Sequence, residues 1–303
     1  MKLKGFLLGI FAAAAYGSIP LFTIPLYNEG MTVNSALFWR YLLAIPVMAI
    51  FMIARKESFK INSLKEGLLL AGAGIIVGLS SVCLFQSYKY MDVGIASTLL
   101  FVYPVLVALI MASFFKERMK LYSWLFLAGT IVGIGMLCKT SGGRTISTIG
   151  LIMISLSSLF YAIYIVGVNR TSLARLSSLK VIFYLLTFGL LVFIIAIACQ
   201  GSFQIPSSFQ SWGNAIGLAI IPTALSFWLT TLAIQHIGAT NTAILGAFEP
   251  VTGVLVSLFA FHGVLSPRET VGIILILVCV TMITAGPALP HIFNRKHHLP
   301  PKR

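Results

Sequence analysis

Long apolar runs separated by short polar segments recur along the whole chain. The runs are continuous, and each has roughly the 20 residues that a helix needs to cross the hydrocarbon core of a bilayer. A transmembrane β-barrel would instead alternate apolar and polar residues in segments of about 10. The pattern predicts an all-α polytopic membrane protein with ten transmembrane helices, at 5–26, 32–53, 66–88, 93–114, 121–138, 148–168, 181–200, 212–234, 239–261 and 269–286.

Composition and charge agree with a chain that lies wholly in a membrane. Of the 303 residues, 58% are hydrophobic and 9% are charged, whereas about a quarter of a soluble domain is charged. The net charge of +14 could suggest a nucleic-acid partner, but its distribution fits a membrane. With the N-terminus inside, 16 of the 21 Lys and Arg lie in inner segments and 4 in outer ones, with Arg40 inside a span. The positive-inside rule therefore predicts two cytoplasmic termini and no nucleic-acid partner.

An internal repeat divides the predicted helices into two sets of five. "GFLLGIFAAAAYG" from Gly5 resembles "GLIMISLSSLFYA" from Gly150, and "RYLLAIPV" at Arg40 lies near "FYLLTFGL" at Phe183. The offset stays near 143–146, and it also sets Pro104 against Pro250.

Because five is odd, the second set must cross the membrane in the opposite orientation. Such inverted repeats are typical of secondary transporters, which bind substrate between the halves near the midplane. The predicted organisation is a first repeat at 1–145, a second repeat at 146–288 and a basic cytoplasmic tail at 289–303.

One acid lies within the ninth predicted span, in "LGAFEPVTGVL". Glu249 is midway along that span, where a charge costs about 3 kcal/mol. It either lines a water-filled cavity and binds substrate or a proton, or it is a structural group that joins helices. The proline after it predicts a kink, and the candidate hinge positions are Pro104, Pro250, Gly246 and Gly253.

Arg40 is the only cation inside a predicted span, and its counterpart in the second half is Phe183. It either lines the cavity and attracts an anionic group, or it reaches the interface or a structural partner. Aromatic and polar side chains complete the candidate set for a small amphipathic solute, with packing as the alternative. They are Tyr16, Trp39, Gln86, Tyr103, Tyr161, Tyr164, Trp228, Thr231 and Asn241.

No catalytic constellation is present in the sequence. It contains no H-E-x-x-H, no phosphate-binding Gly-rich loop and no paired membrane aspartates, and its four cysteines are scattered. We therefore expect no enzymatic activity, no cofactor and no metal. Without an ATP-binding site, transport would be passive or coupled to a proton or a counter-solute.

Several motifs together resemble the drug/metabolite transporter superfamily, specifically its ten-helix EamA-type exporters. They are "AAAAYGSIPLF", "ALFWRYLLA", "ASTLLFVYPVLVALIMASFFKERM" and "AILGAFEPVTGVLVSLFAF". The resemblance implies ten helices, an inverted repeat, cytoplasmic termini and a central cavity. Arg40, Glu249 and Pro250 match motif positions, and Glu117 matches a structural one. The second repeat departs from the pattern at Val264, where the family has an acid, so the outer end of the ninth helix should be held differently.

The sequence thus predicts a multi-pass transporter of the bacterial inner membrane. We expect it to export or exchange small metabolites, such as amino acids or related amphipathic solutes, by alternating access. Two alternatives stay open: an efflux transporter for drugs or organic cations, and a membrane scaffold that transports nothing. The fold alone does not select the substrate.

Overall fold

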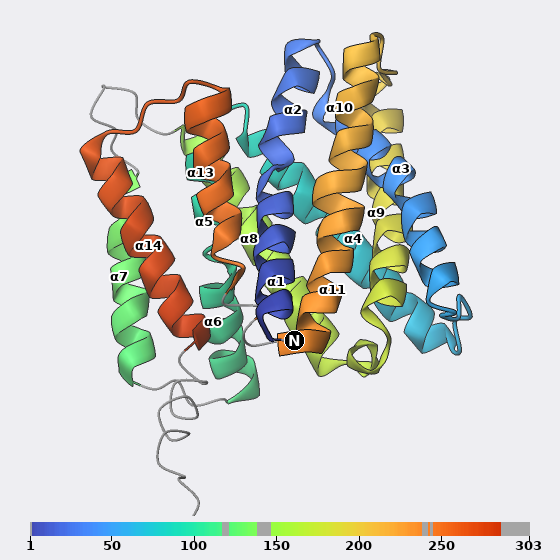
Figure 1. Cartoon of the computed structure of the whole chain (residues 1–303), viewed down its shortest axis with the longest axis horizontal. Coiled ribbons are helices and arrows are strands. Elements are labelled where there is room, and N and C mark those ends of the chain that lie inside the picture. The colour runs from blue at the N-terminus through green and yellow to red at the C-terminus, as the bar shows by residue number, and fades with distance from the viewer. Residues whose placement is uncertain (1, 117–120, 138–146, 238–241, 243–244, 286–303) are drawn as a thin grey trace, which may run out of the picture.

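The computed structural model describes residues 2–116, 121–137, 147–237, 242 and 245–285, and every regular element in these ranges is a helix (Figure 1). The helices before residue 146 are α1 (Lys2–Gly17), α2 (Ile19–Asn28), α3 (Val33–Ala54), α4 (Leu64–Ser87), α5 (Val93–Leu100), α6 (Tyr103–Phe115) and α7 (Leu121–Leu137). Those after it are α8 (Thr148–Arg170), η1 (Ser172–Arg175), α9 (Ser178–Gln200), α10 (Phe209–Ala219), the π-helix η2 (Ile220–Leu225), α11 (Ser226–Ile237), α13 (Phe248–Ala260) and α14 (Pro267–Ala285).

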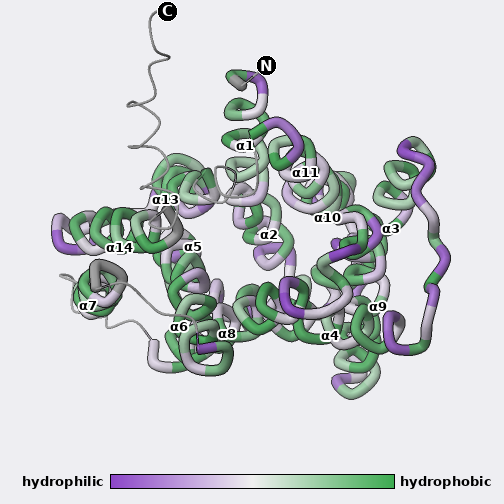
Figure 2. Tube along the Cα trace, turned by 90° about the horizontal axis from the view of Figure 1, so that it is seen from below, coloured by the Kyte–Doolittle hydropathy of each residue, from purple (hydrophilic) through white to green (hydrophobic). Residues whose placement is uncertain are grey.

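The described helices confirm a multi-pass helical membrane protein. Seven stretches are long and apolar enough to cross a bilayer: Leu3–Asn28, Val33–Ala54, Leu64–Ser87, Val93–Phe115, Thr148–Arg170, Ser178–Gln200 and Phe209–Ile237. Figure 2 shows hydrophobic residues along these helices and hydrophilic ones mainly at their ends and in the loops. Helices suit this environment because lipid offers no hydrogen-bond partner to an open backbone.

Polar caps define where several helices begin. Thr32, Ser63, Asp92, Ser177 and Ser208 each accept a hydrogen bond from a backbone N–H in the first turn of the following helix. Such caps satisfy amides that the helix itself leaves unpaired. The polar loops of the sequence therefore fix the helix starts to within a few residues of the predicted spans.

Prolines lie at or near the places where long helices are interrupted. The backbone turns at Phe101 and Val102 between α5 and α6, just before Pro104. It turns again at Gly246 and Ala247, just before Pro250. Between α10 and α11 the π-helix η2 contains Pro222. Proline cannot donate the regular helical hydrogen bond, which accounts for breaks at these sites.

The two halves of the chain interleave rather than pack as separate bodies (Figure 1). The most extensive contacts join an element of one half to an element of the other: α4 with α8 and α9, α3 with α9, α1 with α11 and α13, α7 with α14, and α5 with α13.

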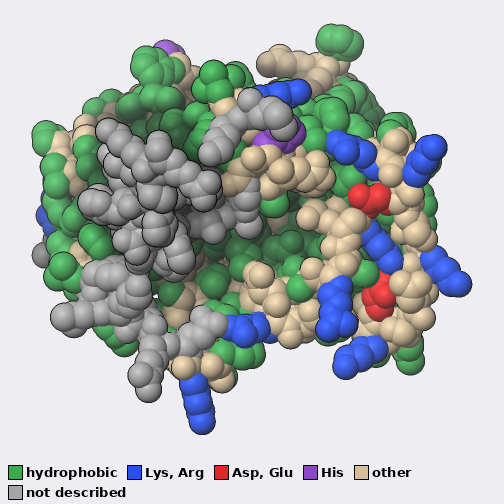
Figure 3. All heavy atoms as spheres, turned by 60° about the horizontal axis from the view of Figure 1, so that its bottom comes forward, with side chains coloured by type: hydrophobic (Ala, Val, Ile, Leu, Met, Phe, Trp, Pro, Cys, Tyr) green, Lys and Arg blue, Asp and Glu red, His purple; other side chains and the backbone are tan. Residues whose placement is uncertain are grey.

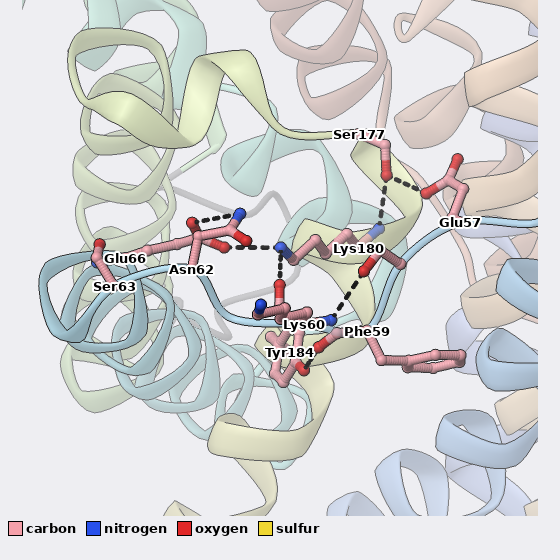
Figure 4. Close-up of polar contacts among 10 residues, drawn as sticks. Glu57, Phe59, Lys60, Asn62, Ser63, Glu66, Ser177, Lys180 and Tyr184 are labelled. Atoms are coloured by element: carbon pink, nitrogen blue, oxygen red, sulfur yellow. Dashed lines mark hydrogen bonds and ion pairs between the residues drawn. The ribbon is translucent and has the colours of Figure 1, made fainter.

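Lysines and arginines gather at the end of the molecule where α1 begins, which we call the basic face (Figure 3). The loop 55–63, which joins α3 to α4, lies there over the start of α9 (Figure 4). Tyr184 donates to the Phe59 carbonyl. Lys180 Nζ lies 2.7 Å from Glu66 Oε1 and donates to the Lys60 carbonyl at 2.6 Å. This loop therefore fastens the first half of the chain to α9.

A second loop makes the matching contact at the opposite face. Residues 201–208, which join α9 to α10, lie over the start of α3, and Trp39 Nε1 donates to the Gln204 carbonyl at 3.0 Å. Trp39 and Tyr184 are 145 residues apart, and so are the two acceptors, Phe59 and Gln204. One interaction thus occurs twice, once at each face.

Helix crossings in the interior also occur in matching pairs. Ser80 Oγ donates to the Ser157 carbonyl at 2.9 Å, which joins α4 to α8. Ser226 Oγ donates to the Ala12 carbonyl at 2.9 Å, which joins α11 to α1. The acceptors are 145 residues apart and the donors 146. The π-helix η2 precedes Ser226 and accommodates an extra residue, which accounts for the change of offset.

Backbone conformation follows the same spacing. Lys56 and Gly201, which are 145 residues apart, both have positive φ at the C-terminal ends of α3 and α9. Lys116 and His262, which are 146 apart, both have positive φ just after α6 and α13.

The equivalent of Arg40 therefore differs from the sequence expectation. The edge-to-edge rings of Phe38 and Trp39, with centroids 5.4 Å apart, match those of Phe183 and Tyr184, 5.2 Å apart. This correspondence pairs Arg40 with Leu185 rather than with Phe183. The short "YLL" match in the sequence was shifted by two residues, because leucine-rich segments align in several registers.

We expect Gly17→Ala to destabilise the fold. A Cβ at Gly17 would overlap the Glu249 carbonyl oxygen, where α1 meets α13, and this rigid backbone atom could not move aside. Overpacking of this kind costs about 1–3 kcal/mol. The measurement is the melting temperature of the purified protein in detergent, which should fall by several degrees.

Gly72→Ala is the matched control, because no heavy atom lies within 4 Å of a Cβ built there. It should leave the melting temperature unchanged or raise it slightly, since alanine favours helix. Equal melting temperatures for the two variants would contradict the close packing of α1 against α13.

Candidate functional site

A central cavity of about 220 Å³ lies between α1, α11 and α13, with α6 and α8 on its far side. It extends from the middle of the molecule, at Tyr16 and Glu249, toward Gly9 and Ile234 near the basic face. That face is hollowed near its centre (Figure 3). The lining residues are Gly9, Ala12, Ala13, Tyr16, Tyr103, Tyr161, Ser226, Phe227, Thr230, Ile234, Thr242, Gly246 and Glu249.

Two smaller cavities adjoin it. One of about 20 Å³ lies toward the opposite face and is lined by Tyr16, Gly17, Ile19, Pro20, Leu84, Tyr88, Ser97, Leu100 and Glu249. The other, of about 30 Å³, surrounds Arg40 and includes Tyr16, Tyr41, Ser81, Tyr161, Tyr164 and Thr223. Tyr16 lines all three cavities, so it stands where they meet.

Glu249 lies at the start of α13 and borders the central cavity and the smaller cavity toward the opposite face. Its backbone N–H donates to the Gly246 carbonyl at 2.9 Å across the turn before Pro250. The break in the helix thus delivers the carboxyl to the middle of the bundle. Although the structure describes both residues, it contains no salt bridge between Glu249 and Arg40.

Arg40 is buried, with 4% of its surface exposed. Its Nε donates to Thr223 Oγ1 at 2.9 Å, and its guanidinium carbon lies 5.4 Å from the centroid of the Phe85 ring. Thr223 Oγ1 in turn donates to the Leu218 carbonyl at 3.0 Å. Thr223 belongs to the π-helix η2, so an irregular turn of backbone holds the only cation in this region of the described chain.

Tyrosines form the wall between Arg40 and the central cavity. The Tyr103 and Tyr161 rings meet edge to face with centroids 4.7 Å apart, and Tyr164 lies 5.6 Å from Tyr161. On the other side, the Tyr16 ring lies 6.1 Å from that of Phe227. Such a wall offers flat apolar surface together with hydroxyl groups, which suits a small amphipathic solute.

The structure brings together most of the residues proposed from the sequence. Those that line the cavities are Glu249, Arg40, Tyr16, Tyr103, Tyr161, Tyr164 and the hinge candidate Gly246. Gly253 lies beside Ser97, where α13 meets α5. Pro104 and Pro250 follow the two helix breaks described above.

Four proposed residues lie outside these three cavities. Trp39 binds the loop 201–208, and Trp228 stacks on Phe51 with centroids 4.8 Å apart. The Thr231 hydroxyl donates to the Phe227 carbonyl of its own helix. Gln86 is partly buried near the end of α4. Asn241 and Glu117 fall outside the described residues.

Sequence reasoning missed several lining residues, notably Thr223, Ser226, Phe227, Thr230 and Thr242. Hydroxyl side chains inside membrane helices are common because they bond to their own backbone, as Thr230 does to Ser226. The repeat could have indicated Ser226, since Ser80 stands 146 residues before it. The described residues contain no cluster of three His, Cys, Asp or Glu that could hold a metal.

A multi-pass helical bundle that encloses a partly polar cavity is the architecture of a membrane transport protein. Comparison with known families specifies the class. A model of the EamA-like transporter family matches residues 3–138 and, separately, residues 148–285. The chain belongs to the EamA-like transporter family.

Individual proteins agree with this assignment. An uncharacterized transporter of Synechocystis sp. is 29% identical over 265 residues, which cover 82% of this chain and 78% of that protein. The biotin transporter of Escherichia coli (strain K12) is 23% identical over 247 residues, 80% of this chain and 81% of that one. A crystal structure of a protein that is 17% identical superimposes with a TM-score of 0.65 over 93% of this chain and 98% of that one, which shows a shared fold.

We expect Thr223→Val to weaken the fold around Arg40. Valine keeps the shape of threonine but leaves the buried Arg40 Nε without the acceptor that it has at 2.9 Å. An unsatisfied buried donor costs about 1–3 kcal/mol. The melting temperature in detergent should fall by several degrees.

Thr187→Val is the control, because the Thr187 hydroxyl donates only within its own helix, to the Phe183 carbonyl. If Thr187→Val lowers the melting temperature as much as Thr223→Val does, the hydrogen bond between Arg40 and Thr223 makes no specific contribution to stability.

Proposed function

We propose that the protein is a secondary transporter that exports or exchanges small amphipathic metabolites, most simply amino acids or related solutes. The observation that carries the proposal is the central cavity, where Glu249 and a tyrosine wall meet next to the buried Arg40. No described Asp or Glu pairs with Arg40. A buried cation without an acidic partner is costly, and a solute anion would offset that cost.

Ten spans in two inverted repeats, 1–145 and 146–288, form the proposed topology. The family model matches the chain twice, once in each half. The paired contacts Trp39–Gln204 and Tyr184–Phe59 lie at opposite faces, as an inverted repeat requires. The abundance of Lys and Arg at the basic face supports its assignment to the cytoplasm. Both termini and the tail 289–303 would then be cytoplasmic.

Glu249 and Arg40 have different roles in this proposal. Arg40 is held by Thr223 and orients an anionic group such as a carboxylate. Glu249 binds a proton or the cationic end of the solute from the other side of Tyr16. A pocket with an acid and a base that do not pair suits a zwitterion. The relative named for biotin supports a small organic solute, but the fold hosts many substrates.

Alternating access would use the helix breaks as hinges. The turn before Pro104 and the turn before Pro250 lie at equivalent positions in the two halves. Gly246 lines the central cavity at the second of these turns. Irregular backbone at mid-depth is tolerated where it is buried in protein or lines a cavity. Bending at these turns would open the cavity to one face and then to the other.

We expect Glu249→Gln to abolish net export. Cells that express the wild type should release one class of solute, and cells with the variant at a matched membrane level should not, because the amide cannot exchange a proton or bind a cation as strongly. The measurement is metabolite profiling inside and outside the cells. Glu29→Gln is the control, since Glu29 bonds Ser208 at the opposite face.

Identical profiles for wild type, Glu249→Gln and a vector control would contradict metabolite export. Drug efflux or a scaffold role would then take its place.

We expect Arg40→Gln to impair transport of anionic and zwitterionic solutes selectively. Loss of one charged hydrogen bond of about 1.5–3 kcal/mol corresponds to a roughly 10–100-fold rise in KM. The measurement is uptake into vesicles that contain the purified variant, with an anionic, a zwitterionic and a cationic solute compared. A loss confined to cations would favour the efflux alternative and contradict the role given to Arg40.

A further inference from the structure

The small cavity toward the opposite face is the closed counterpart of the central cavity. We propose that solute passes the outer half of the membrane through this small cavity, between α2, α4 and α5, and that Ser157 and Ser158 of α8 hold α4 and α5 in the closed arrangement in the present state. The inference rests on the proposed function and identifies the outer path and its seal, neither of which the family assignment specifies.

Equivalent positions line the two cavities. Thr230 and Ile234 of α11 border the central cavity, and the residues 146 positions earlier, Leu84 and Tyr88, border the small one. Gly246 lines the central cavity, and Leu100, which is 146 positions earlier, lines the small one. The offsets are those of the paired hydrogen bonds in the fold. Equivalent positions of the two halves thus line both cavities, of which one has a volume of about 220 Å³ and the other about 20 Å³.

Both cavities reach the same centre. Tyr16 and Glu249 line each of them. The central cavity runs from this centre toward the basic face, and the small one runs toward the opposite face, where α4 ends and α5 begins. A solute bound at Tyr16 and Glu249 thus has a wide path to one side and a narrow path to the other.

Two serines of α8 bind the two helices that border the narrow path, α4 and α5. Ser157 Oγ donates to the Ser80 carbonyl of α4 at 2.8 Å, and Ser80 Oγ returns a bond to the Ser157 carbonyl at 2.9 Å. Ser158 Oγ lies 3.2 Å from the carbonyls of Leu99 and Leu100 in α5. These bonds draw α8 against both helices that border the small cavity.

The corresponding seal of the central cavity lacks these hydroxyls. Ala12 and Ala13 of α1 stand 145 residues before Ser157 and Ser158, and both line the open cavity. There the Ser226 hydroxyl of α11 donates to the Ala12 carbonyl of α1. Leu84 and Tyr88 are also bulkier than their counterparts, Thr230 and Ile234. The two halves thus share one arrangement, and side-chain chemistry favours closure of the outer path.

Cysteine labelling tests the proposal. In protein with Cys83, Cys138, Cys199 and Cys279 replaced by serine, Ser97→Cys reports on the outer path and Thr242→Cys on the inner one. A membrane-impermeant maleimide is applied to intact cells for the first and to inside-out vesicles for the second.

We expect Ser97→Cys to label slowly and Thr242→Cys to label fast. Adding Ser157→Ala with Ser158→Ala should raise the first rate about tenfold and lower the second.

Ser87→Ala is the control, because the Ser87 hydroxyl bonds only within α4, to the Leu84 carbonyl. Tyr88→Cys replaces Ser97→Cys if the latter does not fold. The proposal would be overturned if loss of both α8 hydroxyls left the labelling rate of the outer cysteine unchanged. It would also be overturned if Ser87→Ala raised that rate as much as the two α8 substitutions do.

Solute flux, measured on the same variants, separates the route from the transport function. Flux without a change in labelling would refute the route and leave transport standing. A labelling change without flux of any tested solute would support the route and refute metabolite transport.

Discussion

Backbone amides and carbonyls that cross a bilayer find no water to bind, and this constraint shapes the whole molecule. The spans are helical because a helix satisfies its own backbone. The exceptions are then informative. The turns before Pro104 and Pro250 and the π-helix around Thr223 border the cavities, through Tyr103, Gly246 and Thr223. The constraint that forces regular helices elsewhere therefore places irregular backbone around the candidate site.

Charged groups within the helices are handled in two ways. Where they support the fold they are tied down: Lys180 pairs with Glu66, and Asp92 caps α5 and accepts a bond from Ser257 Oγ at 2.5 Å. This second contact joins the end of α13 to the start of α5. It lies near Val264, where the family resemblance led us to expect an acid. Arg40 and Glu249 instead border cavities and make no salt bridge with each other. Charged side chains that border a cavity and form no salt bridge with each other therefore distinguish the candidate site from the rest of the fold.

Some contacts occur at equivalent positions in both halves of the chain, whereas the two cavities differ in volume. The loop 55–63 is hydrogen-bonded to α9 at one face, and the loop 201–208 is hydrogen-bonded to α3 at the other. Because both loop contacts are present in one state, the proposed alternating access does not require either of them to break. The cavities differ: one is wide and its counterpart is narrow. Under the proposed mechanism, the change between states takes place around these two cavities rather than at the loops.

The sequence alone determined the helical membrane class, the approximate spans and the isolated residues Arg40 and Glu249, because long uncharged apolar runs suit lipid and a single charge within one is conspicuous. It could not decide which side of each helix faces the centre. A helix surrounded by lipid and protein is apolar all round, so the polar stripe that orients a helix in a soluble protein is absent. In the sequence, Trp39 and Trp228 are as good candidates as Tyr16. In the structure, Trp39 binds the loop 201–208 and Trp228 stacks on Phe51. Which residues line the cavities follows from the interleaving of the two halves, because the walls of each cavity come from segments more than a hundred residues apart.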